Sequence, residues 1–373
     1  MQREQVNQPI SCVHDENLSS LIRRIKMQKK LLAIAVGATM VAAPMFAQAD
    51  VKLKGKIQVE VANIDGGDQL DGSSRYDGVT VQGDNNGMSR WLIDASKDLG
   101  NGLKAIGRVA WQINPSNNFD QRNRDQYVGL AGGFGAVVLG RLPTPYKMNG
   151  GVKWDPYVAT FMQARQAGGM SGSALGHNSF VDDVVAYVMP EIAGINATFA
   201  YVGDETGGMN GTWTAGGTGK WGPIEVILAA TGADIAGTAD EDATNVDQKK
   251  IGIRYKGNGL TAAWQYEDVD TSGPINAYGG MPTGFDAGAG KFNFINLGYK
   301  FGNTLIAGNY GRFSGETGVA DADYGALGVR YFFDKKVSVY GGYATTDVKK
   351  INSEPKAGVG QYDRWGAGMR YDF

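Results

Sequence analysis

Few residues of this chain could carry out covalent chemistry. After residue 49 the chain has no cysteine and one histidine, His177, which lies close to Ser179 in a glycine-rich segment. A hydrolytic site needs a nucleophile, a base and an orienting acid that meet in space, so this pair is weak support for one. The same inventory excludes disulfides, thiolate chemistry and zinc sites built from histidine and cysteine. A hydrolase is a remote alternative, and we predict no catalytic residue, no cofactor and no metal site.

Charged side chains that alternate with apolar ones are far more numerous. In the segment 51–61, Val51, Leu53, Ile57, Val59 and Val61 alternate with Lys52, Lys54, Lys56, Gln58 and Glu60. In the last ten residues, Trp365, Ala367, Met369, Tyr371 and Phe373 alternate with Arg364, Gly366, Gly368, Arg370 and Asp372. A period of two residues is typical of β-strands, and after residue 49 no segment shows a convincing helical stripe. The sequence therefore predicts an all-β domain.

Such strands fit two environments. A soluble sandwich would bury the apolar face and expose the charged one, whereas a transmembrane barrel turns the apolar face to lipid and the charged face to a wet lumen. The connections favour the barrel. Seven tight turns, near 100–102, 132–135, 190–193, 222–223, 258–259, 302–303 and 334–335, alternate with eight longer connections, near 63–87, 113–122, 142–178, 203–211, 232–247, 270–290, 313–321 and 348–360. Fifteen connections join sixteen antiparallel strands, and the first and last must pair because unpaired edges are costly in hydrocarbon.

The N-terminal region predicts export. Residues 27–49 (MQKKLLAIAVGATMVAAPMFAQA) combine two lysines, a short apolar run and a small-residue ending, which is typical of a secretory signal peptide. Residues 1–26 are then a start-site overcall or an extension lost on export, and 50–373 form the barrel. Without residues 1–49, which hold six basic and three acidic side chains, 30 basic and 35 acidic side chains remain, a net charge of about −5. This acidic balance argues against a nucleic-acid partner.

Three segments resemble the general porins of Gram-negative bacteria. These are SRWLIDASKDLGNGLKAIGRVAWQ (Ser89–Gln112), RDQYVGLAGGFGAVVLGRLPTPY (Arg124–Tyr146) and the final Tyr371-Asp372-Phe373. The resemblance implies a sixteen-stranded, trimeric barrel of the cell outer membrane that lets small hydrophilic solutes and ions diffuse passively, with a long third loop folded into the pore. A substrate-selective outer-membrane channel is the alternative. Tyr371 and Phe373 would form the signal for the barrel-assembly machinery.

The resemblance also directs attention to particular charges. In the family a basic cluster lies on the early strands opposite the third loop, which favours Arg90 and Arg108 as constriction residues. Arg141 opens that loop here and could line the pore or anchor the loop. Within 142–178, Lys147, Lys153 and Arg165 face one acid, Asp155, an excess of two positive charges that predicts a mild anion preference. Alternation adds a set of lumen-wall residues: Asp94, Lys104, Lys250, Arg254, Lys300, Arg364 and Arg370.

The barrel would be surrounded by lipid and lipopolysaccharide. Outer-membrane lipid would contact the apolar face, with aromatic girdles near the strand ends. Acidic external loops, among them the segment that contains Asp65 and Asp68, could bind lipopolysaccharide phosphates through divalent cations.

Overall fold

The computed structural model describes residues 49–65, 78–83, 88–116, 121–165, 168–172, 175–177, 180–203, 211–235, 244–272, 289–316, 321–349 and 360–373. The predicted signal peptide and most of the long connections lie outside these ranges. No helix in the described part of the chain is long and apolar enough to cross a bilayer.

Strands dominate the described residues, as predicted. The first nine are β1 (Asp50–Asp65), β2 (Gly78–Gln82), β3 (Arg90–Gly100), β4 (Leu103–Ile113), β5 (Gln121–Gly132), β6 (Gly135–Pro143), β7 (Phe180–Val188), β8 (Ile195–Val202) and β9 (Trp213–Trp221). The others are β10 (Ile224–Ile235), β11 (Thr244–Gly257), β12 (Leu260–Ser272), β13 (Gly290–Phe301), β14 (Thr304–Gly315), β15 (Ala322–Phe332), β16 (Val337–Val348) and β17 (Gly360–Asp372). Two short helices, α2 (Pro145–Met148) and η1 (Gly151–Lys153), follow β6.

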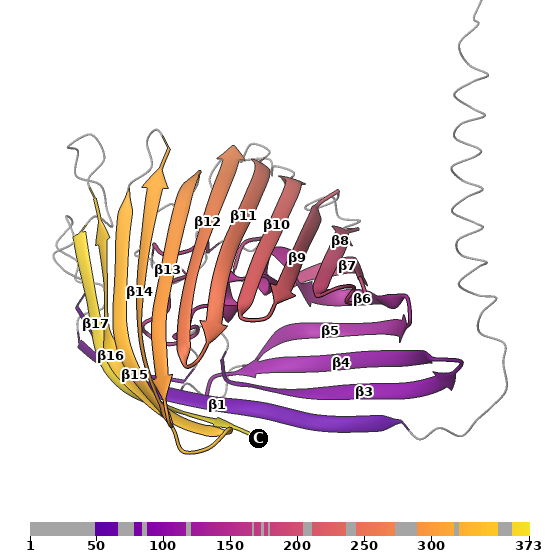
Figure 1. The fold of residues 1–373 in the computed structure, drawn as a ribbon, viewed down its shortest axis with the longest axis horizontal. Helices are drawn as coiled ribbons and strands as arrows, with labels where there is room; N and C mark the ends of the chain where they lie inside the picture. Colours follow the sequence, from indigo (N-terminus) through magenta and orange to yellow (C-terminus); the bar gives the residue numbers. More distant parts are fainter. Residues whose placement is uncertain are drawn as a thin grey trace, which may run out of the picture. The chain divides into compact units, whose positions relative to one another are not determined.

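The strands form one closed antiparallel barrel. Each strand from β3 onward pairs with the next, and β17 pairs with β1, where Ile57 faces Tyr371. Figure 1 shows β1 between β17 and β3 at this closure. The sheet has 17 strands, but β2 and β3 share one position, because β1 pairs with β2 through Glu60–Ile64 and with β3 through Asp50–Lys56. The predicted barrel of sixteen strand positions is confirmed.

The first long connection is shorter than predicted. We predicted that this connection covers residues 63–87, but Gly78–Gln82 pair with β1 as strand β2. Residue 83 and the described residues 88–89 then interrupt this strand position before β3 begins. The Ser89 hydroxyl bonds the carbonyl groups of Gly83 (2.7 Å) and Gln58 (3.0 Å) and so holds the break against β1.

The seven tight turns lie where they were predicted. Two of them contain Asn-Gly pairs in which both residues have positive φ: Asn101 and Gly102 at 51° and 75°, and Asn258 and Gly259 at 51° and 81°. Such a pair suits a two-residue hairpin because asparagine and glycine tolerate left-handed backbone better than other residues. The short turns therefore gather at one end of the barrel and the long connections at the other.

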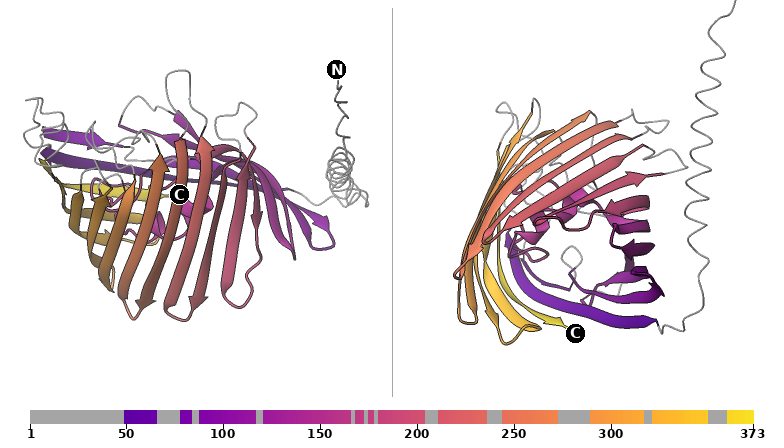
Figure 2. Two further views of the ribbon diagram at one scale, coloured as in Figure 1. Left: turned by 90° about the horizontal axis from the view of Figure 1, so that it is seen from above. Right: turned by 45° about the vertical axis from the view of Figure 1, so that its right-hand side comes forward.

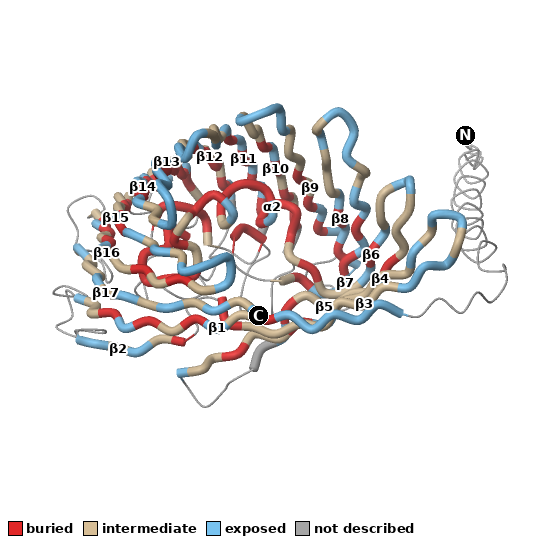
Figure 3. The backbone as a smooth tube through the Cα atoms, turned by 60° about the horizontal axis from the view of Figure 1, so that its bottom comes forward, coloured by how far each residue is buried: buried red, intermediate tan, exposed pale blue. Residues whose placement is uncertain are grey.

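The two faces of the barrel have the polarity that the membrane alternative requires. Outward side chains are apolar and exposed, for example Leu53 (64%), Leu228 (59%) and Leu297 (59%), whereas Gln248 (0%) and Gln265 (1%) face inward and are buried. Figure 3 shows exposed and buried positions following one another along strands such as β13 and β14. A soluble sandwich would have the reverse arrangement, so that alternative is wrong.

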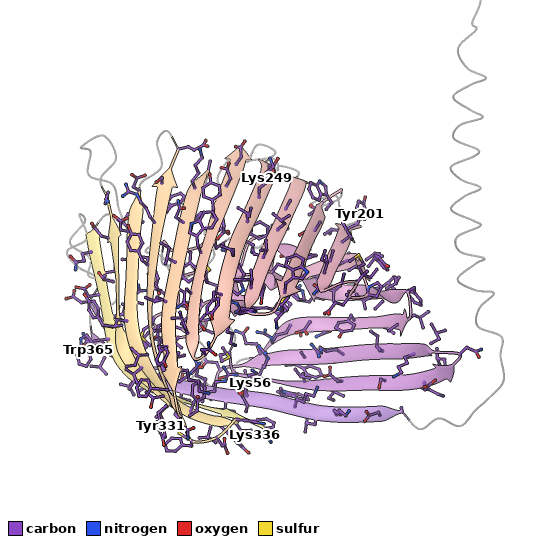
Figure 4. The ribbon with its side chains drawn as sticks, viewed as in Figure 1. Lys56, Tyr201, Lys249, Tyr331, Lys336 and Trp365 are labelled. Carbon is purple, nitrogen blue, oxygen red and sulfur yellow. The ribbon has the colours of Figure 1, made fainter. Side chains whose placement is uncertain are left out.

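Aromatic residues lie near both ends of the outer face. Exposed Tyr201 and Trp365 lie toward the long connections, and exposed Tyr331 lies near the tight turns. The labels in Figure 4 place Tyr201 and Tyr331 at opposite ends of the strands. Girdles of this kind border the apolar band of membrane barrels.

Candidate functional site

The long segment between β6 and β7 lies against the inner side of the barrel, as the right-hand view of Figure 2 shows. Its hydrogen bonds reach strands that are distant in sequence. The Tyr157 hydroxyl lies 2.6 Å from the carbonyl oxygens of both Ala307 on β14 and Gly328 on β15. Gln58 on β1 donates to the Ala159 carbonyl over 2.5 Å. We call the whole connection (144–179) the inner loop. Its middle part, around Tyr157 and Ala159, is thus fixed to strands on both sides of the barrel closure.

Asp155 organises a turn in the inner loop. This residue is 4% exposed. Its carboxylate accepts hydrogen bonds from the backbone N–H groups of Tyr157 (2.8 Å) and Ala164 (2.9 Å) and from the Asn309 amide on β14 (2.8 Å). Burial raises the pKa of Asp155, and these hydrogen bonds and the Arg165 charge partly offset this increase. Three donors therefore enclose the carboxylate and hold it within the loop, and the role of Asp155 in the constriction stays a prediction.

A buried polar cluster attaches another part of the inner loop to β11 and β12. Glu267 on β12 is 1% exposed and accepts hydrogen bonds from the hydroxyls of Tyr146 (2.8 Å) and Ser171 (2.5 Å) and from the Gln265 amide (2.9 Å). The Gln265 carbonyl oxygen accepts from the Gly151 N–H over 2.6 Å. We call the following residues the docking cluster: Tyr146, Ser171, His177, Lys250 and Glu267.

His177 is fully buried and joins the inner loop to β11. Its Nε2 lies 3.0 Å from the Lys250 ammonium, and its Nδ1 lies 2.9 Å from the Ser171 carbonyl oxygen. This geometry fits a neutral ring that donates from Nδ1 and accepts at Nε2. Burial, followed by the Lys250 charge, holds the pKa of His177 well below 6.5.

The docking cluster contains a serine, a histidine and an acid, but not in the order of a catalytic triad. In a triad the serine and the acid approach opposite ring nitrogens. Here Ser171 Oγ (3.1 Å) and Glu267 (3.5 Å) both approach Nδ1 of His177. The other ring nitrogen, Nε2, contacts the Lys250 ammonium instead. Ser179, the serine that the sequence suggested, lies outside the described residues.

Basic side chains line the inner face of the strands around the closure. Lys56 on β1 stands in register between Arg90 on β3 and Asp372 on β17. Arg330 on β15 lies over the Tyr340 ring on β16, 5.1 Å from its centroid. We call the following residues the basic row: Lys56, Arg90, Arg108, Arg124, Arg330 and Arg370.

Acids pair with four members of the basic row, among them Arg124, whose Nε lies 4.0 Å from Asp125. Arg108 bonds Asp94 (2.6 Å) and Asp125 (3.1 Å), and Asp372 lies 2.7 Å from Arg370. Asp372 also pairs with Lys56 at 3.8 Å. Glu60 lies on the same inner face and accepts from the Tyr340 hydroxyl. Among the residues that the structure describes, the six cations of the row thus stand against four acids, which leaves the row a positive excess.

The sequence of this chain matches that of a known protein family. A sequence pattern described as Gram-negative porin matches residues 32–351. The chain belongs to the Gram-negative porin family. This porin is 34% identical over 190 residues to outer membrane porin protein 32 of Delftia acidovorans, which covers 48% of this chain and 50% of that protein. The match thus spans about half the length of this curated relative.

Solved structures share the fold of this porin along its barrel. An anion-selective porin from Comamonas acidovorans has a TM-score of 0.69 at 22% identity and covers 87% of this chain and 100% of its own. The trimer form of OmpT, an outer membrane protein of Vibrio cholerae, has a TM-score of 0.63 at 16% identity, with coverage of 87% and 99%. These likenesses show the fold, and the family places the porin in the outer membrane.

The predicted loop cations of this porin do not share one place. Lys147 on α2 lies beside the basic row, with its Nζ 4.4 Å from the Phe180 ring centroid, and Arg124 faces the same ring at 4.7 Å. Burial and the charges of Arg165 and Arg124 hold the pKa of Lys147 well below its usual value. Arg165 is buried and donates to the His177 carbonyl over 2.9 Å, so it holds the loop. Lys153 is exposed.

Arg141 lies away from these cations. It has the strand parity of the exposed residues Val137 and Leu139, and it pairs with Asp182 on β7 at 2.6 Å. Its parity was ambiguous because Val138 on the inner face is also apolar. That valine packs in a cluster with Leu175 of the inner loop, so the loop explains the apolar residue. The predicted constriction role of Arg141 does not fit its place on the outer face.

Two predicted wall residues instead hold the inner loop. Lys250 donates to the Tyr146 carbonyl over 2.6 Å. Arg254 pairs with Glu225 at 2.5 Å and lies 5.4 Å from the Trp154 ring centroid. Alternation predicted their inward direction, but it could not show that the loop would cover them.

The other wall residues lie at different levels of the barrel. Asp94 and Arg370 belong to the ion pairs of the basic row. Lys300 lies over the Phe332 ring (4.7 Å), and Arg364 donates to Thr346 (2.8 Å). Lys104, in register with Asp98 near a tight turn, is exposed.

The predicted assembly residues, Tyr371 and Phe373, lie where β17 pairs with β1, which we call the seam of the barrel. Phe373 and Gly55 exchange backbone hydrogen bonds of 2.9 and 3.1 Å. A Cβ atom on Gly55 would stand 2.1 Å from the Phe373 ring, so the glycine leaves room for that ring. Tyr371 lies 5.9 Å from Phe373 between ring centroids. Both side chains face outward.

Three members of the basic row were not among the predicted site residues. Lys56 was already on the charged side of the first strand. Arg330 alternates with Val329 and Tyr331, and this pattern could have identified it. Arg124 lies where the pairing of β4 and β5 shifts register between Val109 and Trp111, so counting alternate residues does not place it.

Proposed function

We propose that this porin is a passive channel for small hydrophilic solutes and ions, with a mild anion preference. The observation that carries the proposal is the positive excess of the basic row on the inner face. Barrels of sixteen strands leave an aqueous channel, and rings of charged side chains bias which ions pass. Lys147 of the inner loop lies beside Arg124 of this row, at the same Phe180 ring, so we propose that the narrowest part of the channel lies near α2.

Two further observations support this proposal. The inner loop lies against the inner wall and contacts the basic row, where Arg330 donates to the Pro156 carbonyl over 3.4 Å, so solutes would pass through the part of the lumen that the loop leaves open. The solved structure described as an anion-selective porin shares the fold. A channel of this kind needs no covalent chemistry.

Ion selectivity tests the proposal directly. Purified protein in a planar bilayer with a KCl gradient should give a reversal potential of the sign that chloride preference requires. Replacing Arg90 and Arg108 by glutamate changes four charge units in the row and should shift the preference toward potassium. Cation preference in the wild type would refute the proposal.

The assembly of this porin is proposed by the same reasoning. We infer that it is a homotrimer, as the OmpT trimer form of similar fold suggests, and that it passes through the barrel-assembly machinery into a membrane of lipid and lipopolysaccharide. Residues 27–49 would be removed as a signal peptide together with 1–26. Intact-mass measurement of the outer-membrane protein should then give a chain that begins at Asp50, and a mass that includes residues 27–49 would contradict this.

A further inference from the structure

The helix α2 is a rigid element of the inner loop. Thr144 caps it by accepting a hydrogen bond from the Lys147 N–H over 3.1 Å, and Pro145 stands at its first turn. The Asn149 side chain closes its other end by donating to the Pro145 carbonyl over 2.8 Å, and Thr218 on β9 donates to Asn149 over 2.6 Å. Figure 3 shows α2 as a buried stretch. Side-chain hydrogen bonds therefore hold both ends of α2.

Two consecutive residues of α2 face different walls. The Tyr146 hydroxyl bonds Glu267 on β12, and Lys250 on β11 bonds the Tyr146 carbonyl and lies 4.2 Å from the centre of its ring. Lys147 lies instead at the Phe180 ring, beside Arg124. Successive residues of a helix point about 100° apart, so fixing Tyr146 on one wall sets where Lys147 stands along the other.

We propose that Tyr146 and Glu267 are positioning residues for anion selectivity, because they hold Lys147 at the basic row. This inference rests on the proposed function and names the groups that set it. The two possible roles of Glu267 predict opposite changes in chloride preference when its charge is removed. Glu267 is an acid inside an anion-preferring channel, so direct electrostatics says that its removal increases the preference for chloride. A positioning role says that its removal decreases that preference, because Lys147 leaves the row.

The experiment measures reversal potentials of single substitutions in a KCl gradient, each between pH 5 and 8 and compared at the pH where the wild-type preference is largest. Glu267→Gln and Tyr146→Phe should both lower the chloride preference, and Lys147→Met sets the largest loss expected. Tyr146→Phe changes no charge, so a loss there is not an effect of charge removal. The heat-dependent shift of the barrel on SDS gels confirms that each variant is folded.

Tyr324→Phe is the matched control. The Tyr324 hydroxyl donates to the Met162 carbonyl, so the same substitution releases the inner loop at a place distant in the loop from α2. The chloride preference should stay at the wild-type value in this variant. A loss as large as that of Tyr146→Phe would overturn the proposal, since any loosening of the loop would then suffice.

A double-mutant cycle completes the test. When Lys147 is already methionine, Tyr146→Phe should produce no further loss, because residues that act through one another are non-additive. An additive loss, or an increase of chloride preference in Glu267→Gln, would overturn the positioning role. A wild type that prefers cations would refute the proposed function instead, and the cycle would still show whether Tyr146 acts through Lys147.

Discussion

At the scale of single residues, the fully buried His177 makes docking of the inner loop sensitive to acid. The pKa of His177 is held well below 6.5 by burial and by the Lys250 charge. An undocked loop would return the ring to water and to its ordinary pKa of 6.5. The undocked loop therefore binds a proton on His177 at a higher pH than the docked loop, so the contribution of His177 to docking, complete above 6.5, weakens as the pH falls below it.

We therefore predict that acidification increases the open-channel current noise of the porin. In His177→Gln the current noise should depend less on pH between 7.5 and 5. A glutamine amide can accept from Lys250 and donate to the Ser171 carbonyl without taking up a proton. Asp155, whose pKa is raised, acts with the opposite sign: its contribution is complete at low pH and weakens as the pH rises. The difference between wild type and His177→Gln isolates the histidine. The same pH dependence in both proteins would contradict the prediction.

At the scale of elements, the turn around Asp155 offers a second prediction. Asp155→Asn keeps the shape of the side chain but replaces an acceptor oxygen by an NH2 group among three donors. An unsatisfied buried group of this kind costs about 1–3 kcal/mol. The inner loop should therefore show more frequent current fluctuations and faster proteolytic cleavage. Asp247→Asn, on the outer face with a half-exposed side chain, is the control and should change neither.

The strands could be predicted from sequence because their signal is local. Alternation over ten residues fixes each strand and its two faces, and Gly and Asn at the turns fix where it ends. The predicted barrel and all seven tight turns follow from this. Strand β2 was missed because it has five residues and no run long enough for the pattern to show.

The site was less predictable because its contacts are long-range. Tyr146 and Glu267 are 121 residues apart, and Gln58 and Ala159 are 101 residues apart. The alternation of apolar and charged residues predicts which side of the barrel wall a residue faces. It does not predict whether the inner loop covers that side. Lys250 was placed correctly on the inner face, yet the loop makes it a docking residue. Lys56 and Arg330 could have been found by the same alternation.

At the scale of the whole molecule, stability depends on closing the ring. Each strand between the first and the last has two neighbours, and β1 and β17 complete the ring through ten residue pairs, from Lys56 with Asp372 to Asp65 with Asp363. Beyond these pairs, Phe373 bonds Gly55 at the end of the seam. Backbone groups left unpaired in hydrocarbon cost several kcal/mol each. The contact between Gly55 and Phe373 is therefore a sensitive point of assembly.

We predict that Gly55→Ala impairs closure. Its new methyl group would lie 2.1 Å from the Phe373 ring, so the ring must leave its place, at a cost of about 1–3 kcal/mol for an overpacked contact. Gly107→Ala on β4 is the matched control, because the nearest atom to its methyl group is 3.5 Å away. Folded barrel is measured by its heat-dependent shift on SDS gels after refolding into detergent. Gly55→Ala should fold in lower yield and unfold at a lower temperature than Gly107→Ala. Phe373→Ala removes the ring, so adding Gly55→Ala to it should cause little further loss. A full further loss in that double variant would show that the glycine is needed for another reason than room for the ring.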